Sequence, residues 1–173
     1  MGHSTHPELP PKARMDLIHQ TGSMDRLQHQ IIVAGVLERN GRYLVIEEMV
    51  NGRRLINQPA GRLEVGEFAA EGAVRETLEE SGYLFIPSAI VGVYQWYHAE
   101  QRTIYLRLAF TGELASQEGI SPSDPQTLAV KWLSASELEL EEDRHRSPFV
   151  LQCIRDHAAG KRYPLDLVRF FSE

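Results

Sequence analysis

Three glutamates stand close together in a stretch that reads GRLEVGEFAAEGAVRETLEESGY. Glu76, Glu79 and Glu80 are spaced so that the second and third lie three and four residues after the first. An α-helix turns about 100° per residue, so this spacing places all three side chains on one face. The stretch therefore predicts a helix from about Phe68 to Ser81 with three carboxylates on one side.

That helix would carry its negative charge at the unfavourable end. Glu79 and Glu80 fall in the last turn, where the macrodipole disfavours acids, and the carboxylates repel one another. A local conflict of this kind indicates a functional site. A hard divalent cation removes the conflict, because Mg²⁺ prefers carboxylate and water oxygens. The alternative is a solvated acidic face, the ordinary explanation for an isolated pair of glutamates.

Other residues of the stretch suit supporting roles. Gly61 permits a tight bend that can turn its carbonyl group toward a metal ion. Arg75 lies beside the acidic face and can pair with Glu67 or Glu79, which would hold the helix and the preceding loop in register. Gly82 suits a left-handed cap at the end of the helix.

The whole spacing, G-x5-E-x7-R-E-x2-E-E-x-G, resembles the Nudix box, the signature of enzymes that hydrolyse a nucleoside diphosphate linked to another moiety. The resemblance implies an α/β fold, the Nudix α/β/α sandwich with a mixed β-sheet between helices. It implies structural roles for Glu67, Arg75 and Gly82. It also implies a cofactor, Mg²⁺ or alternatively Mn²⁺, held by the following groups: Glu76, Glu79, Glu80 and the carbonyl of Gly61.

Further segments are similar to the bacterial NudJ-type phosphatases, namely YLVIEEMVNGRRLINQPAGRLE, LRLAF, RSPFV and GKRYPLDL. This similarity implies hydrolysis of nucleoside di- and triphosphates, and of thiamine diphosphate or its hydroxymethylpyrimidine diphosphate precursor. Three residues differ from those usual in the box, namely Thr77, Ala60 and Tyr83. None of them is an expected metal ligand, so the differences affect the expected packing and loop shape and not the expected activity.

Two alternative functions stay open. One is a Nudix pyrophosphatase for ADP-ribose or a dinucleoside polyphosphate, and the other is a non-catalytic module that senses nucleotides.

The identity of the general base is also left open. Glu76 and Glu80 are candidates inside the box, and Glu100, Glu118 and Asp124 are acids of later loops. Asp124 is preferred among the loop acids because it precedes the strand of Trp132, where the Nudix family often places an extra acid.

Candidate substrate contacts come from the flanking segments. Arg107 lies among apolar strand residues, where a phosphate contact would explain it, although an arginine at the rim of the core is an equal alternative. Arg54 borders the loop ahead of the box and can meet a terminal phosphate, although a surface hairpin arginine is the alternative. Gln58 can hydrogen-bond substrate from that loop. Trp96, with Tyr94 and Tyr97 beside it, can stack on a base or pyrimidine ring, although strand aromatics are usually core residues.

Length and composition limit the possible number of domains, the possible partners and the expected location of the protein. The 173 residues suit one domain, and the formal net charge of −6 offers no basic surface for nucleic acid or anionic membranes. Cys153 is the only cysteine, so an internal disulfide is excluded. With no apolar signal or transmembrane run, we expect a cytoplasmic enzyme that acts on a small-molecule phosphoanhydride. The oligomeric state is left open.

The elements that must position these residues follow from the patterning. Residues 1–28 predict a flexible extension, and residues 29–173 a single domain with a C-terminal helix. Asn40-Gly41 predicts a hairpin between strands at 31–37 and 43–46. Longer strands are expected at 90–98 and 103–112, a short strand at 128–133, and a helix capped by Ser147 that ends before Gly160. We expect the tail from Tyr163 to pack back on the body.

Overall fold

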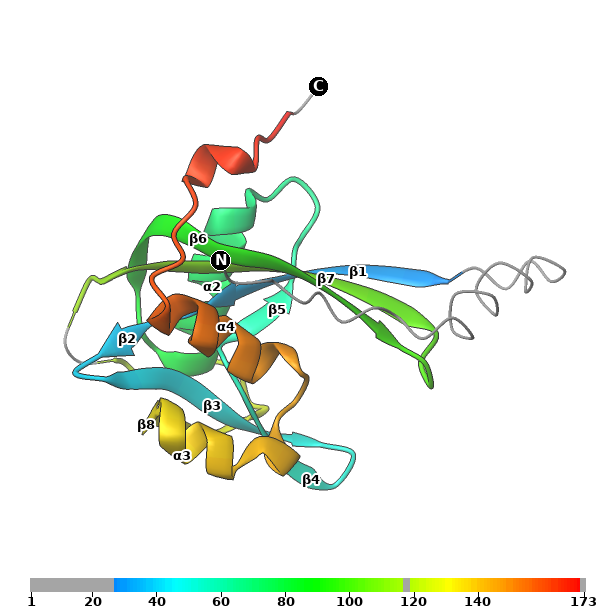
Figure 1. Cartoon of the computed structure of the whole chain (residues 1–173), viewed down its shortest axis with the longest axis vertical. Helices are drawn as coiled ribbons and strands as arrows, with labels where there is room; N and C mark the ends of the chain where they lie inside the picture. Colours follow the sequence, from blue (N-terminus) through cyan, green and yellow to red (C-terminus); the bar gives the residue numbers. More distant parts are fainter. Residues whose placement is uncertain (1–26, 117–118, 172–173) are drawn as a thin grey trace, which may run out of the picture.

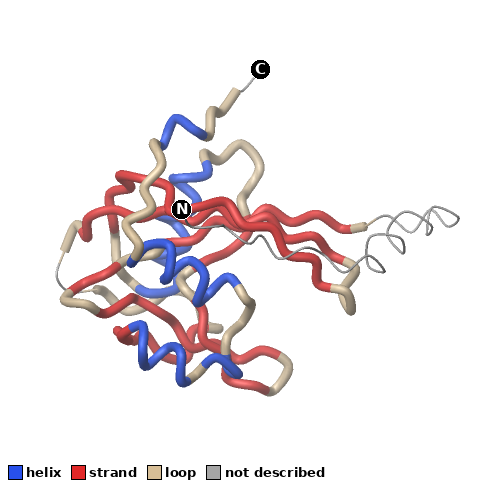
Figure 2. Tube along the Cα trace, viewed as in Figure 1, coloured by secondary structure: helices blue, strands red, loops and turns tan. Residues whose placement is uncertain are grey.

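The computed structural model describes residues 27–116 and 119–171 (Figures 1 and 2). The extension predicted for residues 1–28 lies almost entirely outside the described residues. In chain order the elements are β1 (Gln28–Gly35), β2 (Glu38–Arg39), β3 (Arg42–Val50), β4 (Arg53–Asn57), β5 (Ala60–Arg62), α2 (Ala69–Ser81), β6 (Phe85–His98), β7 (Thr103–Leu114), β8 (Thr127–Ser134), α3 (Ala135–Leu140), the 3-10 turn η1 (Glu142–Arg144), α4 (Phe149–Ala158) and the 3-10 turn η2 (Leu165–Leu167).

The strands form two sheets. The first has the order β5-β1-β7-β6 and is mixed, because β1 runs parallel to β7 while β5 and β6 pair antiparallel to their neighbours. The second is antiparallel and is built on β3, which pairs with β2, β4 and β8. The α/β class and the mixed sheet predicted from the sequence are confirmed.

The predicted hairpin needs a correction. The Asn40-Gly41 turn exists, with φ of 53° and 76° as a type I′ turn requires, but it joins β3 only to the two-residue strand β2. The run at 31–37 instead pairs with β7 in the mixed sheet and leaves it after Gly35. The chain changes sheets there because the Val36 N–H donates to the Phe110 carbonyl (2.7 Å) while the Leu37 carbonyl accepts from Leu44 (2.9 Å).

Helices α2 and α4 lie on opposite sides of the strands, behind and in front of them in Figure 1. Neighbouring strand residues alternate between two apolar clusters, as the period of two requires. Val36 and Val91 pack with the α4 residues Phe149, Cys153 and Ile154. The α2 side holds the adjoining strand residues, in a cluster that includes Val33, Leu37, Leu44, Ala73, Ile90, Leu108 and Phe110. The strands are therefore sandwiched between two helical layers.

Helix α2 packs through small residues. Its buried positions are Ala69, Gly72, Ala73, Thr77 and Ser81. The Thr77 hydroxyl donates to the Ala73 carbonyl (2.7 Å), and a Cβ on Gly35 of β1 would overlap that hydroxyl. Thr77 thus replaces the usual aliphatic residue without leaving a polar group unpaired, and α2 lies very close to β1.

The C-terminal tail packs on the body as expected. Tyr163 and Ile90 exchange two backbone hydrogen bonds of 2.8 Å each. Leu165 and Val168 pack on the α2-side cluster, and the Phe170 ring lies 4.4 Å from that of Phe68. The tail therefore covers the start of α2.

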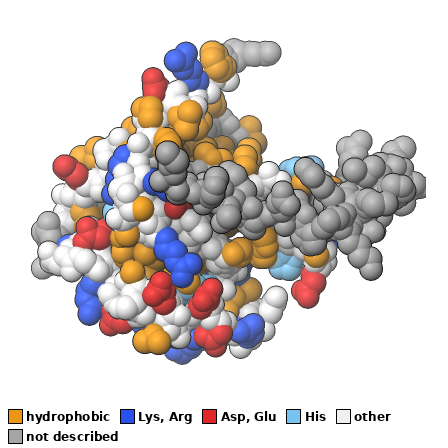
Figure 3. Space-filling view, viewed as in Figure 1, with side chains coloured by type: hydrophobic (Ala, Val, Ile, Leu, Met, Phe, Trp, Pro, Cys, Tyr) orange, Lys and Arg blue, Asp and Glu red, His pale blue; other side chains and the backbone are white. Residues whose placement is uncertain are grey.

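The outer surface is mixed in charge. On the face that carries α3 and α4, Lys and Arg side chains stand among Asp and Glu side chains (Figure 3). Within residues 27–116 and 119–171, no helix is long and apolar enough to cross a membrane.

Gly82 ends α2 in the predicted left-handed conformation (φ 74°), and its N–H donates to the Leu78 carbonyl (2.9 Å). A Cβ there would overlap the Ile120 carbonyl, so we expect Gly82→Ala to lower the free energy of unfolding by about 2–4 kcal/mol in urea titrations. The control is Gly52→Ala, with φ of 77° and open space around it, which should cost about 1 kcal/mol. Equal losses would contradict the steric argument.

Candidate active site

Arg75 is the hub of the site. Its Nε and Nη2 atoms donate to the two carboxylate oxygens of Glu67 at 2.7 and 3.0 Å, a bidentate pair. Its Nη1 donates to Glu76 Oε1 (2.7 Å) and Glu79 Oε2 (3.2 Å), and its Nη2 reaches the Arg62 carbonyl (3.2 Å). Both pairings predicted for Arg75 are present, and they tie α2 to the preceding loop.

Glu67 is the anchor of that loop. Its Oε2 accepts the Glu64 N–H (3.1 Å), and the Arg75 guanidinium lowers the pKa of its carboxyl group. The absence of a side chain at Gly72 makes room for it, since a Cβ there would lie 2.7 Å from Glu67 Oε2. Glu67 therefore joins the loop to α2 through Arg75, and its structural role stays a prediction.

Glu76 lies against the bend at Gly61. A Cβ at Gly61 would overlap the carboxyl group of Glu76, so only glycine allows this approach. Burial raises the pKa of Glu76, and the neighbouring Arg75 opposes that rise. Gly61 and Glu76 thus form one unit although fifteen positions separate them in the chain.

Glu80 is the most perturbed acid of the site. Burial raises its pKa to about 8, and the charges of Glu76, Glu48 and Asp124 add to the rise. The Ala60 N–H, which donates to Glu80 Oε2 at 2.7 Å, opposes it. Strongly raised acid pKa values are characteristic of functional sites.

Glu48 belongs to this acidic cluster and was missed from the sequence. Burial raises the pKa of its carboxyl group, which lies 3.8 Å from the Arg146 guanidinium. Glu47 beside it points to the other face of β3 and pairs with Lys131 (2.8 Å) and Arg144 (2.5 Å). The sequence feature that could have revealed Glu48 is the pair Glu47-Glu48 within the otherwise apolar strand β3. The predicted strand ended at Ile46, so this pair was not considered part of it.

Asp124 is brought to the cluster by the loop before β8. The backbone N–H groups of Ser123 and Asp124 donate to the Glu79 carbonyl at 2.9 and 3.0 Å. The charge of Asp124 contributes to the raised pKa values of Glu80 and Glu48. The structure therefore places it beside the box. Of the other loop acids, Glu100 lies in the β6–β7 turn, and Glu118 is outside the described residues.

Arg107 and Gln58 lie beneath the site rather than on its surface. They are 3% and 1% exposed, and Arg107 Nη1 donates to Gln58 Oε1 (3.0 Å). Arg107 Nη2 donates to Asn57 Oδ1 (3.2 Å), and Gln58 Nε2 donates to the Val150 carbonyl (2.8 Å). This burial does not support the direct substrate contacts predicted for the pair. Their bonds instead join β7, the end of β4 and α4.

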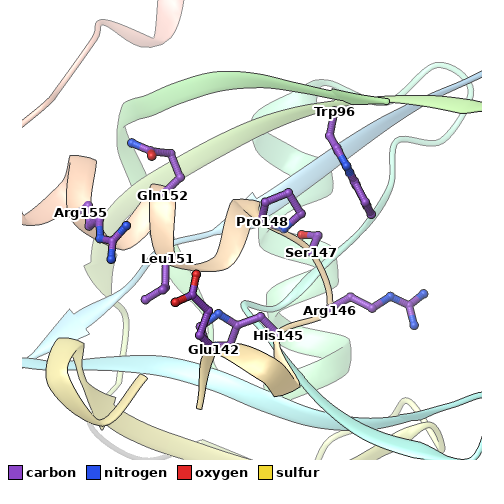
Figure 4. Close-up of a pocket in the computed structure, with 9 residues that line it drawn as sticks. All are labelled: Trp96, Glu142, His145, Arg146, Ser147, Pro148, Leu151, Gln152 and Arg155. Carbon is purple, nitrogen blue, oxygen red and sulfur yellow. The ribbon is translucent and has the colours of Figure 1, made fainter. Parts of the chain in front are cut away.

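Trp96 lines a hollow of about 520 Å³ between β6 and the segment around the start of α4 (Figure 4). Tyr94 and Tyr97 do not share this position. Tyr94 donates to Asp156 Oδ2 (3.0 Å) and packs on the core, while Tyr97 is on the opposite face of β6. Arg54 is exposed on β4, and its phosphate contact stays a prediction.

A divalent cation suits the acidic cluster by its chemistry. The donors are hard oxygens, and Glu48, Glu76 and Glu80 all have pKa values raised by burial with their charges facing one another. Among the described side chains, no three Asp, Glu, His or Cys groups already converge on one point. Arg75 binds Glu76 and Glu79, and the Ala60 amide binds Glu80. These bonds use one carboxylate oxygen of each glutamate, namely Glu76 Oε1, Glu79 Oε2 and Glu80 Oε2, so the second oxygen of each would be the one to face a cation.

Comparison with known proteins gives three concordant findings. The family model for the NUDIX domain matches residues 27–153. Phosphatase NudJ of Escherichia coli K12 is 39% identical over 142 residues, covering 82% of this chain and 92% of that protein. A solved NUDIX hydrolase from Nitrosomonas europaea has a TM-score of 0.79 and 39% identity, covering 83% of this chain and 98% of that one.

A more distant solved structure shares the fold. It is a bifunctional NMN adenylyltransferase/ADP ribose pyrophosphatase from Francisella tularensis, complexed with AMP and a manganese ion. Its TM-score is 0.63 at 21% identity, and the match covers 87% of this chain and 45% of that chain.

The Arg75–Glu67 ion pair should make a measurable contribution to the free energy of unfolding. Glu67→Gln removes the charge from a carboxylate that is 14% exposed, so we expect the free energy of unfolding to fall by about 1–3 kcal/mol in urea titrations at pH 7. The same change at Glu139, whose ion pair with Arg155 is about half exposed, should cost less than about 0.5 kcal/mol. A loss at Glu67 no larger than at Glu139 would show that Arg75 is not a structural hub.

Proposed function

This chain belongs to the Nudix hydrolase family, and within that family we propose a divalent-metal-dependent phosphatase that hydrolyses phosphoanhydride bonds. Its proposed substrates are nucleoside di- and triphosphates, and thiamine diphosphate or its hydroxymethylpyrimidine diphosphate precursor. The observation that carries the proposal is the acidic cluster around Glu80, because buried carboxylates held against one another attract the cation that such a reaction needs. The name of the 39% identical relative, a phosphatase, supports release of phosphate.

The metal ligands proposed are the box residues Glu76, Glu79 and Glu80 with the Gly61 carbonyl. The ion is Mg²⁺, with Mn²⁺ as the alternative. When bound, it would neutralise charge on the diphosphate and lower the pKa of a water molecule. Glu48 adds negative charge at the same place and would favour cation binding without a direct bond.

The protein's own contribution is position and proton transfer. Glu80 has one carboxylate oxygen fixed by the Ala60 amide, so Oε1 is the atom left either to hold the cation or to take the proton from the attacking water. Asp124 and Glu76 are the alternative acceptors, and Asp124 is held by the amides that bind the Glu79 carbonyl. Arg146, at the edge of the cluster beside Glu48, would offset phosphate charge. Phosphoryl transfer depends chiefly on such positioning and charge.

Glu80→Gln tests the site. We expect kcat to fall about 100-fold or more, because the amide can neither bind a cation strongly nor accept the proton. Stability should be unchanged or higher, since burial already disfavours the charged form of this carboxyl group and glutamine has no charged form. The matched control is Glu71→Gln on the same helix, where the side chain is exposed and activity should be that of the wild type.

A second readout of the same variants does not depend on turnover. Millimolar Mg²⁺ should raise the Tm of the wild type and of Glu71→Gln, because a ligand that binds the folded state stabilises it. The shift should be much smaller in Glu80→Gln. Wild-type turnover in Glu80→Gln, or equal shifts in all three proteins, would contradict the proposed site.

A product panel tests the substrate class. With Mg²⁺, we expect inorganic phosphate from ADP, GDP and hydroxymethylpyrimidine diphosphate, measured by a phosphate assay alongside chromatography of the organic product. AMP released from ADP-ribose or from a dinucleoside polyphosphate, without phosphate release from the diphosphates, would instead favour the pyrophosphatase alternative. No turnover of any of these compounds would argue against both and favour a nucleotide-sensing role.

A further inference from the structure

The hollow beside Trp96 is bounded by polar and apolar walls from different parts of the chain. Trp96 comes from β6, and the facing side comes from the segment that runs from η1 into α4 (Figure 4). His145, Arg146 and Ser147 line it together with Gln152. A volume of about 520 Å³ is typical of sites for small organic ligands.

Two polar atoms of this lining are buried without a partner. Ser147 Oγ and His145 Nε2 have no hydrogen-bond partner among the described residues, and Ser147 is only 9% exposed. Buried polar atoms are nearly always paired, so each exception needs an explanation.

Ser147 is notable because the sequence predicts another use for it. A serine before proline at a helix start is expected to cap the helix, yet α4 has Pro148 as its N-cap and no side-chain cap bond. The hydroxyl group is therefore not used by the fold. Ser147 lines the hollow, and a ligand there would meet its buried hydroxyl group once the side chain rotates toward it.

The apolar wall is suited to a flat ring. The indole of Trp96 is held by Tyr105, stacked at 5.7 Å, and by Phe149, edge-on at 6.1 Å. In Figure 4 it extends from β6 toward the segment that carries Ser147 and Arg146. A braced aromatic surface opposite two unpaired polar atoms is the arrangement that recognises a heteroaromatic ring by its face and its edge.

The hollow adjoins the acidic cluster. Arg146 lines it and also lies 3.8 Å from Glu48, whose charge acts on Glu80. The Arg146 N–H donates to the Ile56 carbonyl (2.8 Å), which fixes this segment to the strand that leads to Gly61. Arg146 therefore links the lining of the hollow to the acidic cluster.

We propose that the hollow is a ring site that binds the flat, nitrogen-containing aromatic ring carried by the diphosphate substrate. Trp96 packs on the ring, and Ser147 Oγ and His145 Nε2 bond to its heteroatoms. The inference rests on the proposed function for its substrate class. The ring is a nucleobase or the aminopyrimidine of the thiamine precursor, which share this chemistry.

The test compares substrates with and without a ring. ADP and hydroxymethylpyrimidine diphosphate carry one, and methyl diphosphate does not. Ser147→Ala should lower the ratio of kcat/KM for a ring-bearing substrate to that for methyl diphosphate about threefold to tenfold, and Trp96→Leu about tenfold to a hundredfold. Unequal losses for ADP and the pyrimidine diphosphate identify the ring for which the site is built.

Matched controls are Ser136→Ala, at an exposed serine of α3, and Tyr97→Leu, which removes an aromatic ring from the opposite face of β6. Both should keep the wild-type ratio. An unchanged ratio in Ser147→Ala and Trp96→Leu, or equal losses on all three substrates, would overturn the ring site.

Binding of AMP separates the two proposals, because AMP has the ring but no phosphoanhydride bond. By calorimetry, Ser147→Ala should weaken AMP binding about threefold to tenfold. This result in a protein that hydrolyses no diphosphate would uphold the ring site and reject the proposed function. Hydrolysis of diphosphates with AMP binding unaffected in Ser147→Ala would do the reverse.

Discussion

The repulsion between carboxylates that the fold forces together is the constraint on which the rest of this structure depends. Glu76 and Glu80 come from one helix, Glu48 from a strand and Asp124 from a distant loop. Burial raises the pKa of Glu80, and the charges of the other three raise it further. An unsupported cluster of this kind would drive α2 away from the strands. Arg75 prevents this on one side by binding Glu67, Glu76 and Glu79 together.

The spacing of the box follows from that requirement. Glu67 and Glu76 can reach Arg75 only if the backbone beside them carries no side chain, and glycines stand at those places. A Cβ at Gly72 would press on Glu67, and one at Gly61 would overlap Glu76. The glycines therefore matter here for close approach of side chains. Gly82 is also needed for its backbone conformation, because it ends the helix with a positive φ. Its carbonyl accepts a hydrogen bond from the Ile120 N–H (3.0 Å).

Local patterns predicted the local structure well, and non-local contacts were the source of the errors. The three-and-four spacing of the glutamates and the position of Gly82 were sufficient to predict α2 and its cap. The Asn40-Gly41 turn was also correct, but no local signal shows that β1 pairs with β7, some seventy positions away, rather than with β3. Glu48 was missed because the predicted strand ended at Ile46, and its place beside Glu80 and Asp124 is a non-local contact that the local pattern does not show. Arg107 was predicted to contact phosphate, and that contact stays a prediction. In the structure two of its guanidinium nitrogens donate to Gln58 and Asn57 in the interior, and its buried Nε has no partner among the described residues.

Those interior bonds join the two halves of the proposed substrate site. Gln58 connects the strand before Gly61 to the Val150 carbonyl of α4, and Arg107 lies over the Phe149 ring at 5.1 Å. Phe149 in turn contacts Trp96. A ring bound beside Trp96 therefore lies on the same buried framework that holds the bend at Gly61. Binding energy gained at the ring can hold the diphosphate in position at the acids, which raises kcat only if the framework is rigid. Gln58 and Arg107 are 1% and 3% exposed and are hydrogen-bonded to each other, an arrangement that favours a rigid framework at this point.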